Sequence, residues 1–175
     1  MRPTVKSDWC RPRKVVVEDI PNLNIRQTQM QVVLSVGRSI GPGDFGPIPS
    51  NVIVVSIAPQ IELLKRAALC ITHAGLNTTL EALAEGVPMV AIPIGYDQPG
   101  VAARIAYHGV GESVKLGNLT VRHLSELIVK VTANPSYRDK ARWFQKVIGE
   151  TRGLDIAVDI IEQAFGENTW KTKRQ

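Results

Sequence analysis

From about residue 31 onward, the sequence alternates short apolar runs with turns and amphipathic runs, and this alternation continues along most of the chain. An apolar run of strand length followed by a helical pattern indicates a βαβ unit, whose strands run parallel and whose crossover is right-handed. Only 5% of the residues are aromatic, and the wealth of Val, Ile, Leu and Ala suits a sheet covered on both faces. We therefore expect an α/β fold with a Rossmann-like parallel sheet and helices on both faces.

Turn residues mark where the expected elements begin and end. A Gly- and Pro-rich loop over residues 37–49 separates two strands, Pro59 opens a short helix, and Gly86 stops the next one. The expected strands are 31–36, 51–57, 69–72, 87–94 and 109–116, and the expected helices are 59–67, 78–84, 101–107, 120–133, 136–148 and 155–165.

The first thirty residues do not join this pattern cleanly. Residues 15–17 form a candidate strand and residues 21–24 a turn, but no helix is evident between this turn and residue 31. The expected parts of the chain are an atypical, poorly ordered segment over 1–30, one α/β domain over 31–166 and a basic tail over 167–175.

Length and charge limit the function classes. With 175 residues, of which 44% are hydrophobic, the chain can bury one sizeable core. The net charge of +5 is concentrated at the ends, with +4 over residues 1–14 and +3 over 171–175, so that the body between them carries −2. Basic ends on a slightly acidic body are typical of solvated termini, which argues against nucleic-acid binding.

Neither the cysteines nor the hydropathy indicate secretion or a membrane span. Cys10 and Cys70 are too few for a disulfide framework, and Cys70 falls in an apolar strand where a small core residue fits. No apolar run approaches the length of about 18 residues that a span needs, and residues 1–30 lack the apolar centre of a signal peptide. We expect a cytoplasmic protein, and membrane association has no support in the sequence.

The stretch from residue 71 to residue 81 brings a histidine, a turn of small residues and a helix N-terminus together. An apolar run stops at His73, Gly75 lets a ligand approach the backbone, and Asn77 or Thr78 can cap the helix that follows. Backbone N–H groups and the positive end of the helix dipole then face the imidazole, an arrangement that binds phosphate. In its protonated form His73 would also offset charge on a departing diphosphate.

Polar residues follow other strands at the same edge of the expected sheet. In open α/β sheets ligands bind beyond the carboxyl ends of the strands, and residues 58–60 and 95–98 lie there together with the His73 turn. Glu81 lies one helical turn inside the helix, where its carboxylate can accept hydrogen bonds from a ribose diol. Asp97 and Gln98 can bind sugar hydroxyls in the same way.

Each of these residues also has a purely structural interpretation. His73 alone fits a histidine at a strand end, and Asn77, Thr78 and Glu81 alone fit an ordinary helix N-terminus. Residues 97–100 alone form a turn. No pair of carboxylates and no cysteine–histidine cluster occurs in these loops, so we expect no metal.

Taken together and in order, these residues resemble a known family. The resemblance rests on Ala58-Pro-Gln60, Ile71-Thr-His-Ala-Gly75, Asn77-Thr78, Glu81, Gly86-Val-Pro88 and Pro93 through Asp97-Gln98. This pattern is similar to the donor-binding signature of the UDP-glycosyltransferases, whose GT-B fold has two domains. The segment 97–109 is most similar to bacterial zeaxanthin and macrolide glycosyltransferases. The resemblance covers about residues 31–165, the larger part of a C-terminal domain.

The resemblance implies a role for each of these positions. Gln60 would contact the base and Glu81 the ribose, and Ala58 would belong to the same set of donor-binding residues. The diphosphate would be bound by His73, Gly75, Asn77 and Thr78, and the transferred sugar by Asp97 and Gln98. The implied reaction is inverting, needs no cofactor or metal, and transfers a hexose, with UDP-glucose as the expected donor, to a hydroxyl of a small lipophilic acceptor.

Two departures from the family leave alternatives open. Ile57 stands where plant members place a tryptophan against the base, which leaves uridine and thymidine diphosphate sugars both open. The acceptor-binding N-terminal domain, which supplies the catalytic base in the family, has no counterpart before residue 31. The chain is thus expected to be inactive alone, as a donor-binding fragment, as one subunit of a bipartite glycosyltransferase that docks an acceptor-binding partner, or as a non-catalytic nucleotide-sugar binding protein.

Overall fold

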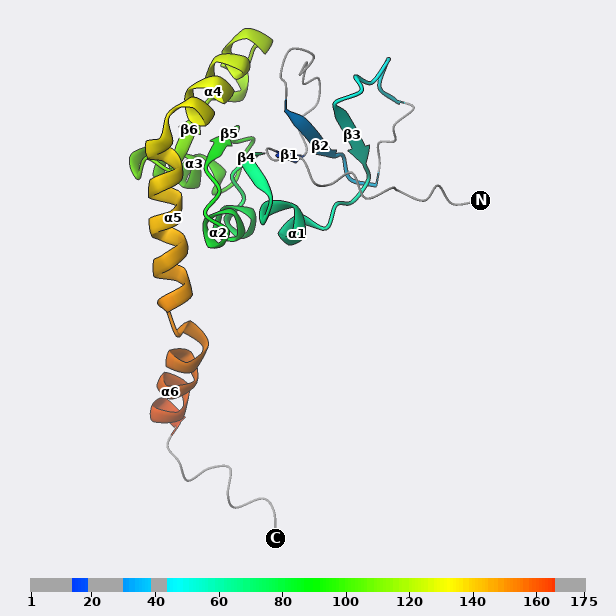
Figure 1. The fold of residues 1–175 in the computed structure, drawn as a ribbon. Helices are drawn as coiled ribbons and strands as arrows, with labels where there is room; N and C mark the ends of the chain where they lie inside the picture. The colour runs from blue at the N-terminus through cyan, green and yellow to red at the C-terminus, as the bar shows by residue number, and fades with distance from the viewer. Residues whose placement is uncertain (1–13, 19–29, 39–43, 166–175) are drawn as a thin grey trace.

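The computed structural model describes residues 14–18, 30–38 and 44–165, and six strands in this part of the chain form one parallel sheet. The sheet order is β3-β2-β1-β4-β5-β6, and every neighbouring pair is parallel (Figure 1). The expected α/β fold with a Rossmann-like parallel sheet is therefore confirmed. The strands are β1 (Lys14–Glu18), β2 (Gln31–Ser35), β3 (Val52–Val55), β4 (Ala67–Thr72), β5 (Met89–Ala91) and β6 (Gly111–Ser113).

From β3 onward helices alternate with these strands, and further helices then close the chain. They are α1 (Gln60–Leu64), α2 (Leu76–Ala84), α3 (Gln98–Tyr107), α4 (Val121–Ala133), α5 (Pro135–Glu150) and α6 (Gly153–Phe165), with a short 3-10 turn, η2, at Leu116–Asn118. Each expected helix is present, but α2 and α3 begin two or three residues earlier than predicted. The last two expected strands are longer than β5 and β6, because Pro88 cannot donate to the ladder and Gly109 adopts a φ of 65° at the end of α3.

The candidate strand over residues 15–17 is confirmed, and it lies in the middle of the sheet. Val16 of β1 pairs with Val33 of β2 on one side and with Cys70 of β4 on the other. The strand order reverses between β1 and β4, which is the point where ligands bind in open α/β sheets. The expected turn at 21–24 and the segment between it and β2 lie outside the described residues.

Alternate side chains of the strands enter two separate cores, one on each face. Val32, Leu69 and Ile71 pack against α4 on one face, whereas Val33 and Cys70 pack against α1, α2 and α3 on the other. Because both faces are covered, the strands read as continuous apolar runs rather than as alternating ones. Cys70 is fully buried, as its place in an apolar run predicts.

Two sets of polar contacts fasten α4 and α5 to the sheet. Arg138 of α5 donates from Nη2 to the carbonyl oxygens of Ala67 and Ala68, at 3.1 and 2.6 Å. Glu112 of β6 pairs with Lys130 of α4, 2.7 Å away, and accepts a short hydrogen bond from the hydroxyl of Tyr137. Burial alone would raise the pKa of Glu112, but the hydrogen bonds from Lys130 and Tyr137 outweigh burial, and the pKa is lowered.

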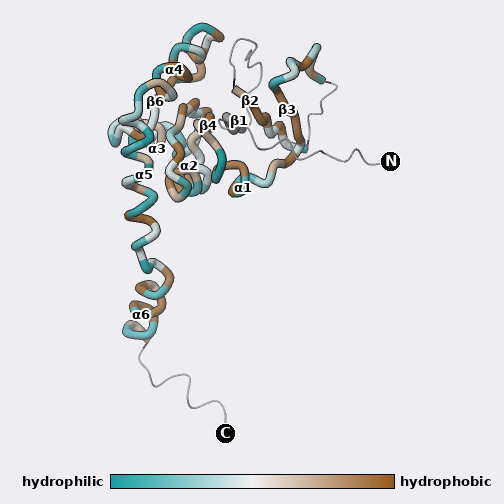
Figure 2. The backbone as a smooth tube through the Cα atoms, in the orientation of Figure 1, coloured by the Kyte–Doolittle hydropathy of each residue, from teal (hydrophilic) through white to brown (hydrophobic). Residues whose placement is uncertain are grey.

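The last helix, α6, extends away from the sheet and its covering helices (Figure 1). None of its residues is buried, although most of its side chains are apolar (Figure 2). Its large apolar side chains are between 51 and 86% exposed, namely Leu154, Ile156, Val158, Ile160, Ile161 and Phe165. Isolated helices of this length are only marginally stable in water, so α6 requires a covering surface. No helix of the described residues is long and apolar enough to cross a bilayer.

Candidate functional site

Most of the predicted site residues follow β4 and β5, two neighbouring strands of which β4 lies beside the reversal of strand order, whereas Ala58 and Gln60 follow β3. Ile92, just after β5, donates from its backbone nitrogen to the carbonyl oxygen of Thr72 at the end of β4, 2.8 Å away. The segments that follow β4 and β5 therefore leave the sheet side by side. The turn at residues 73–75 follows β4, and the loop at 93–97 follows β5.

The turn after β4 is held in a strained backbone conformation. Ala74 has a φ of 68°, in the left-handed region, and its side chain is fully buried. This conformation costs a non-glycine residue about 1–2 kcal/mol. The backbone nitrogen of Ala74 donates to the hydroxyl of Thr72, 3.2 Å away, which helps to hold the turn. Such strain concentrates at functional sites because the surrounding fold maintains it.

Gly75 provides room for the imidazole of His73. A Cβ atom at position 75 would lie 2.6 Å from Nε2 of His73, so the ring occupies the space that a side chain would fill. Nδ1 of His73 is buried and has no hydrogen-bond partner among the described residues. An unpartnered buried polar nitrogen is costly in free energy. The histidine is therefore not the satisfied strand-end residue of the structural interpretation.

The helix α2 begins directly after this turn, with Gly75 as its N-cap residue. No side chain caps it, so the prediction that Asn77 or Thr78 provides the cap is wrong. The reason is that the helix starts at Leu76, which places both residues inside its first turn. The uncapped N-terminus carries the positive end of the helix dipole, about half an elementary charge, and it lies beside the His73 ring.

Gln60 joins α1 to α2 through two side chains. Its Nε2 donates to Oγ1 of Thr78, 3.2 Å away, and to Oε2 of Glu81, 2.5 Å away. The structure thus brings Gln60, Thr78 and Glu81 into one cluster, although 18 to 21 residues separate them in the chain. Ala58, which precedes α1, is half-buried and packs against the core on the α2 face.

Gln98 shapes the loop after β5. Its Oε1 accepts hydrogen bonds from the backbone nitrogens of Ile94 and Gly95, at 2.8 and 3.0 Å. Because both partners are donors, the amide must present its oxygen to the loop, and its nitrogen is left to donate elsewhere. Asp97 is exposed at the N-terminus of α3. Tyr96 beside it has a φ of 56° and is 99% exposed.

The predicted residues therefore fall into two groups. One contains Gln60, His73, Gly75, Asn77, Thr78 and Glu81 around the start of α2, and the other contains Asp97 and Gln98 in the neighbouring loop. Sequence reasoning missed Ala74 and Tyr96, because neither residue type signals a left-handed backbone; the only local hint is the glycine beside each.

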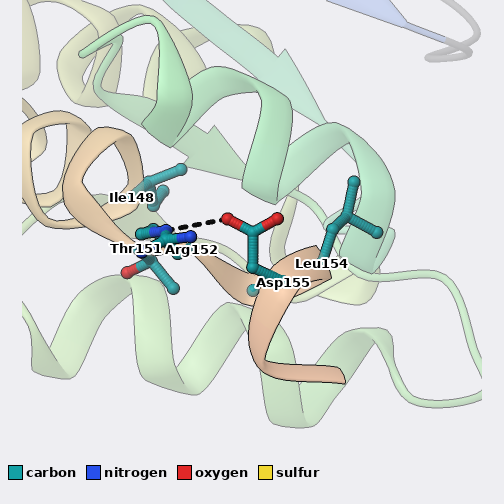
Figure 3. A pocket seen from close by; sticks show the side chains of 6 residues that line it. Ile148, Thr151, Arg152, Leu154 and Asp155 are labelled. Carbon is teal, nitrogen blue, oxygen red and sulfur yellow. Dashed lines mark hydrogen bonds and ion pairs between the residues drawn. The ribbon is translucent and has the colours of Figure 1, made fainter. Parts of the chain in front are cut away.

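A separate hollow of about 520 Å³ lies where α5 meets α6 (Figure 3). It is lined by Ile148, Thr151, Arg152, Gly153, Leu154 and Asp155. Arg152 and Asp155 form a solvent-exposed ion pair at 2.7 Å. It contains none of the predicted site residues. Across the described ranges, no three His, Cys, Asp or Glu side chains gather closely enough to hold a metal ion.

A doubly wound parallel sheet with an uncapped helix N-terminus beside its switch point is the arrangement found in nucleotide-binding α/β domains. Comparison with known proteins narrows this class. The family model described as UDP-glucoronosyl and UDP-glucosyl transferase matches residues 42–165. The chain therefore belongs to this family of UDP-glycosyltransferases.

Individual relatives agree with this assignment. The NDP-glycosyltransferase YjiC of Bacillus licheniformis is 36% identical over 137 residues, which are 78% of this chain and 35% of the relative. The zeaxanthin glucosyltransferase of Pantoea ananas is 38% identical over 113 residues, 64% of this chain and 26% of the relative. The resemblance to bacterial zeaxanthin glycosyltransferases is thus confirmed.

The solved structures agree in fold. The crystal structure of the glycotransferase of kitacinnamycin superposes with a TM-score of 0.78 at 26% identity, and the match covers 93% of this chain but 47% of that one. The fold is therefore that of one half of a GT-B glycosyltransferase. The chain spans about a third of the length of the curated relatives that it matches and about half of the solved structures.

Proposed function

We propose that this chain is the donor-binding domain of an inverting, metal-independent glycosyltransferase, with UDP-glucose as its first candidate donor. The observation that carries the proposal is the buried, unpartnered Nδ1 of His73 beside the uncapped N-terminus of α2. A diphosphate would accept from the imidazole and from the backbone amides at the helix start. The absence of a Cβ atom at Gly75 leaves room for the imidazole beside the helix start.

The remaining site residues support an extended ligand on either side of that diphosphate. Gln60 and Glu81 lie together on one side and offer amide and carboxylate groups to a nucleoside. Gln98, held by its loop, keeps an amide N–H group for a sugar hydroxyl, and Asp97 beside it keeps an exposed acceptor. During transfer, the imidazole N–H of His73 and the positive end of the α2 dipole would stabilise the leaving diphosphate.

The acceptor in this proposal is a small lipophilic alcohol, whose hydroxyl attacks the anomeric carbon of the sugar. His73 is not assigned as the base that deprotonates this hydroxyl, because in this proposal its imidazole binds the diphosphate. The base and the acceptor-binding surface would come from another domain or subunit. The chain alone should bind donor without transferring sugar.

Exposed apolar side chains support such a partner. Ile57, Leu76, Ile94 and Tyr96, each more than half exposed, border the donor loops, and α6 leaves all its large apolar residues exposed. Patches of this kind mark interaction surfaces. The polar side of α6 carries Asp155, Asp159 and Glu162, whereas helices that bind membrane surfaces carry Lys and Arg there. A protein surface therefore suits α6 better than a lipid one.

A partner docked on these surfaces fits both an acceptor-binding domain of the same protein and a separate subunit of a bipartite enzyme. A non-catalytic nucleotide-sugar binding protein is the remaining alternative, and it would bind donor without any partner that restores transfer. Adding an acceptor-binding half from a zeaxanthin glucosyltransferase and measuring glucose transfer to zeaxanthin separates a catalytic donor domain, in either arrangement, from a non-catalytic binding protein.

Calorimetric titration with UDP tests the donor site directly. We expect binding by the unaltered chain and a loss of at least about tenfold in affinity in both His73→Ala and Glu81→Ala, since each removes a hydrogen bond to a charged group. Lys146→Ala on the exposed face of α5 serves as the control. Equal affinity in all four proteins would refute the site.

A further inference from the structure

Four rings from α3 and α5 form a continuous row, here called the aromatic row. Tyr107 ends α3 and His108 follows it, and their rings meet edge to face with centroids 5.1 Å apart. The ring of His108 contacts Phe144 of α5 in the same way at 5.4 Å, and Phe144 contacts Trp143 at 4.9 Å. Edge-to-face contacts are favourable for aromatic rings. They therefore join two helices that lie far apart in the sequence into one surface.

Most of the aromatic row faces solvent. Phe144 anchors it by packing against the core on the α2 face. Tyr107 is 86% exposed, Trp143 is 57% exposed, and His108 is exposed as well. Val147, one helical turn beyond Trp143, is also exposed and extends the apolar surface. Large rings are usually well covered in a soluble domain, so packing of the fold does not explain why they gather here.

Basic side chains flank the aromatic row. Arg104 lies one turn before His108 on α3, where its carbonyl oxygen accepts from the His108 backbone nitrogen. Lys140 lies one turn before Phe144 on α5, and its Cγ would be 4.0 Å from a Cβ atom on Gly109, directly after His108. Together α3 and α5 carry five basic and two acidic residues, a net charge of +3. These two helices are thus positive on a body that is slightly negative.

We propose that the aromatic row and its flanking cations form a docking surface for an anionic lipid bilayer. Tyr and Trp concentrate at the boundary between lipid headgroups and hydrocarbon, because their rings are apolar and carry a polar group at one edge. Lys and Arg near a membrane surface are attracted to anionic lipids. The rings would lie at headgroup level, with Arg104 and Lys140 toward the phosphate groups. Attachment of this kind is peripheral and needs no spanning helix.

The charged residues of α5 favour lipid over protein as the occupant. Lysine is depleted in protein interfaces but attracts anionic membrane surfaces. Lys140 flanks the aromatic row, and Lys146 follows Trp143 by about one turn. The acidic residues of α5 are Asp139 and Glu150, and Glu150 forms an exposed ion pair with Lys146 at 3.8 Å. On α6 the polar side is acidic, so the surface of α3 and α5 suits an anionic bilayer better than α6 does.

This docking surface leaves the donor site accessible. The helix α3 begins at Gln98, in the loop that carries the predicted sugar-binding residues, and runs for ten residues to Tyr107, a length of about 15 Å. The strand β6 begins shortly afterwards, at Gly111, so the aromatic row lies toward the amino ends of the strands. The donor loops lie at the carboxyl ends. The inference goes beyond the proposed function and does not rest on it.

Sedimentation of the full chain with lipid vesicles tests this surface. Binding should be at least about tenfold tighter to vesicles of phosphatidylcholine and phosphatidylglycerol than to phosphatidylcholine alone. The double variant Arg104→Gln, Lys140→Gln should lose about tenfold in affinity for the anionic vesicles, and Tyr107→Ser, Trp143→Ser a similar factor. All four side chains are exposed, so thermal unfolding should show that these variants remain folded.

Two matched controls remove the same kinds of side chain elsewhere. Tyr96→Ser removes an almost fully exposed ring from the donor loop, and Lys115→Gln removes an exposed cation just before η2. Neither should change vesicle binding. A loss in Tyr96→Ser or Lys115→Gln equal to that in the surface variants would overturn the inference, because binding would then not be confined to α3 and α5.

Tryptophan fluorescence reports whether the aromatic row itself meets the lipid. The chain has three tryptophans, and the double variant Trp9→Phe, Trp170→Phe leaves Trp143 as the reporter. Its emission should shift to shorter wavelength with the anionic vesicles and should be quenched by lipids brominated close to the headgroup. Unshifted emission from a chain that sediments with the vesicles would place another segment on the membrane and overturn the inference.

The remaining outcomes also decide the matter. Equal binding to both kinds of vesicle, or to neither, would overturn the inference. Loss of binding in Ile160→Ser together with full binding in Tyr107→Ser, Trp143→Ser would assign the membrane contact to α6 instead. If no vesicle binds and Trp143→Ser changes the oligomeric state in ultracentrifugation, the surface is a protein interface. Vesicle binding by a chain that does not bind UDP would refute the proposed function and leave this inference standing.

Discussion

His73 and Gly75 occupy adjoining space at the turn after β4, where a side chain on Gly75 would overlap the imidazole. The ring can lie over the turn only because position 75 lacks a Cβ atom. The glycine thus serves the placement of the histidine as much as the approach of a ligand to the backbone.

Gly75→Ala should therefore weaken UDP binding by about tenfold or more, since it displaces the imidazole by steric overlap rather than by chemical removal. Its φ of −61° is one that alanine adopts readily, so stability should change little. Affinity by calorimetry and thermal unfolding on the same samples separate the two effects. Gly95→Ala, where an added Cβ meets no atom within 4 Å, is the matched control. UDP affinity that survives in Gly75→Ala would contradict this placement of His73.

Gln98→Glu keeps both acceptor contacts to the backbone nitrogens of Ile94 and Gly95 but removes the amide donor. The loop should remain intact, and affinity for UDP should be unchanged. Affinity for UDP-glucose should fall by roughly tenfold relative to UDP, because a sugar hydroxyl loses its donor. Gln98→Met, which removes both functions, should unfold at a lower temperature. An unaltered preference between UDP-glucose and UDP in Gln98→Glu would exclude Gln98 from sugar binding.

The stability of the fold should fall in acid partly through Glu112. The pKa of this carboxyl is lowered in the folded state, because the hydrogen bonds from Lys130 and Tyr137 exceed the opposing effect of burial. Its stabilising contribution is present above the unfolded-state pKa and is lost as the pH falls through the folded-state value. Urea unfolding from about pH 6 down to about pH 3 should show a shallower decline in Glu112→Gln than in the unaltered chain. Parallel curves for the two proteins would refute this contribution.

Gly111→Ala should destabilise the fold strongly. A Cβ atom there would overlap the carbonyl of Met89 on the neighbouring strand, and Ile105 of α3 leaves no room for relief. Overpacking of a core costs about 1–3 kcal/mol, and a clash with backbone lies at or above the upper end of that range. Gly117→Ala in η2, where nothing lies within 4 Å, should be close to neutral. Chemical denaturation of both variants measures the difference, and equal midpoints would contradict the close approach of β5 and β6.

Ile160→Ser on α6 should leave the unfolding free energy within about 0.5 kcal/mol of the unaltered chain, because this side chain is exposed and packs against no core. Ile105→Ser in α3, which is buried, should cost several kilocalories per mole by comparison. The same Ile160→Ser change should weaken docking of an acceptor-binding partner. A large loss of stability in Ile160→Ser would mean that α6 packs within this chain.

Most strands and helices of the fold can be predicted from the sequence, because the patterns that indicate them are local. Apolar runs with proline or glycine at their ends identify the strands, and Gly86, with a φ of 65°, ends α2 as predicted. The first residue of α2 is harder to predict from the sequence, because Leu76 is an exposed apolar residue with no capping pattern before it. The place of β1 in the centre of the sheet depends on pairing with distant strands, which no local pattern encodes.

The sequence predicts a set of candidate site residues but not their geometry. The order of Gln60, His73, Glu81 and Asp97 along the chain indicates which loops converge. That Gln60 donates to Thr78 and Glu81, or that Gln98 turns its oxygen toward its own loop, follows from side-chain torsions that the sequence does not reveal. The left-handed backbone of Ala74 and Tyr96 cannot be predicted from the sequence either, since alanine and tyrosine rarely adopt it.

The position of β1 has a consequence for any shortened version of this protein. Removing an edge strand would narrow the sheet, but removing β1 would divide it into a two-stranded piece, β2 with β3, and a three-stranded piece, β4 to β6. Each piece would then present a row of unpaired backbone groups to the other, and two-stranded pieces do not persist alone in water. The five residues of β1 therefore hold the two halves of the sheet together.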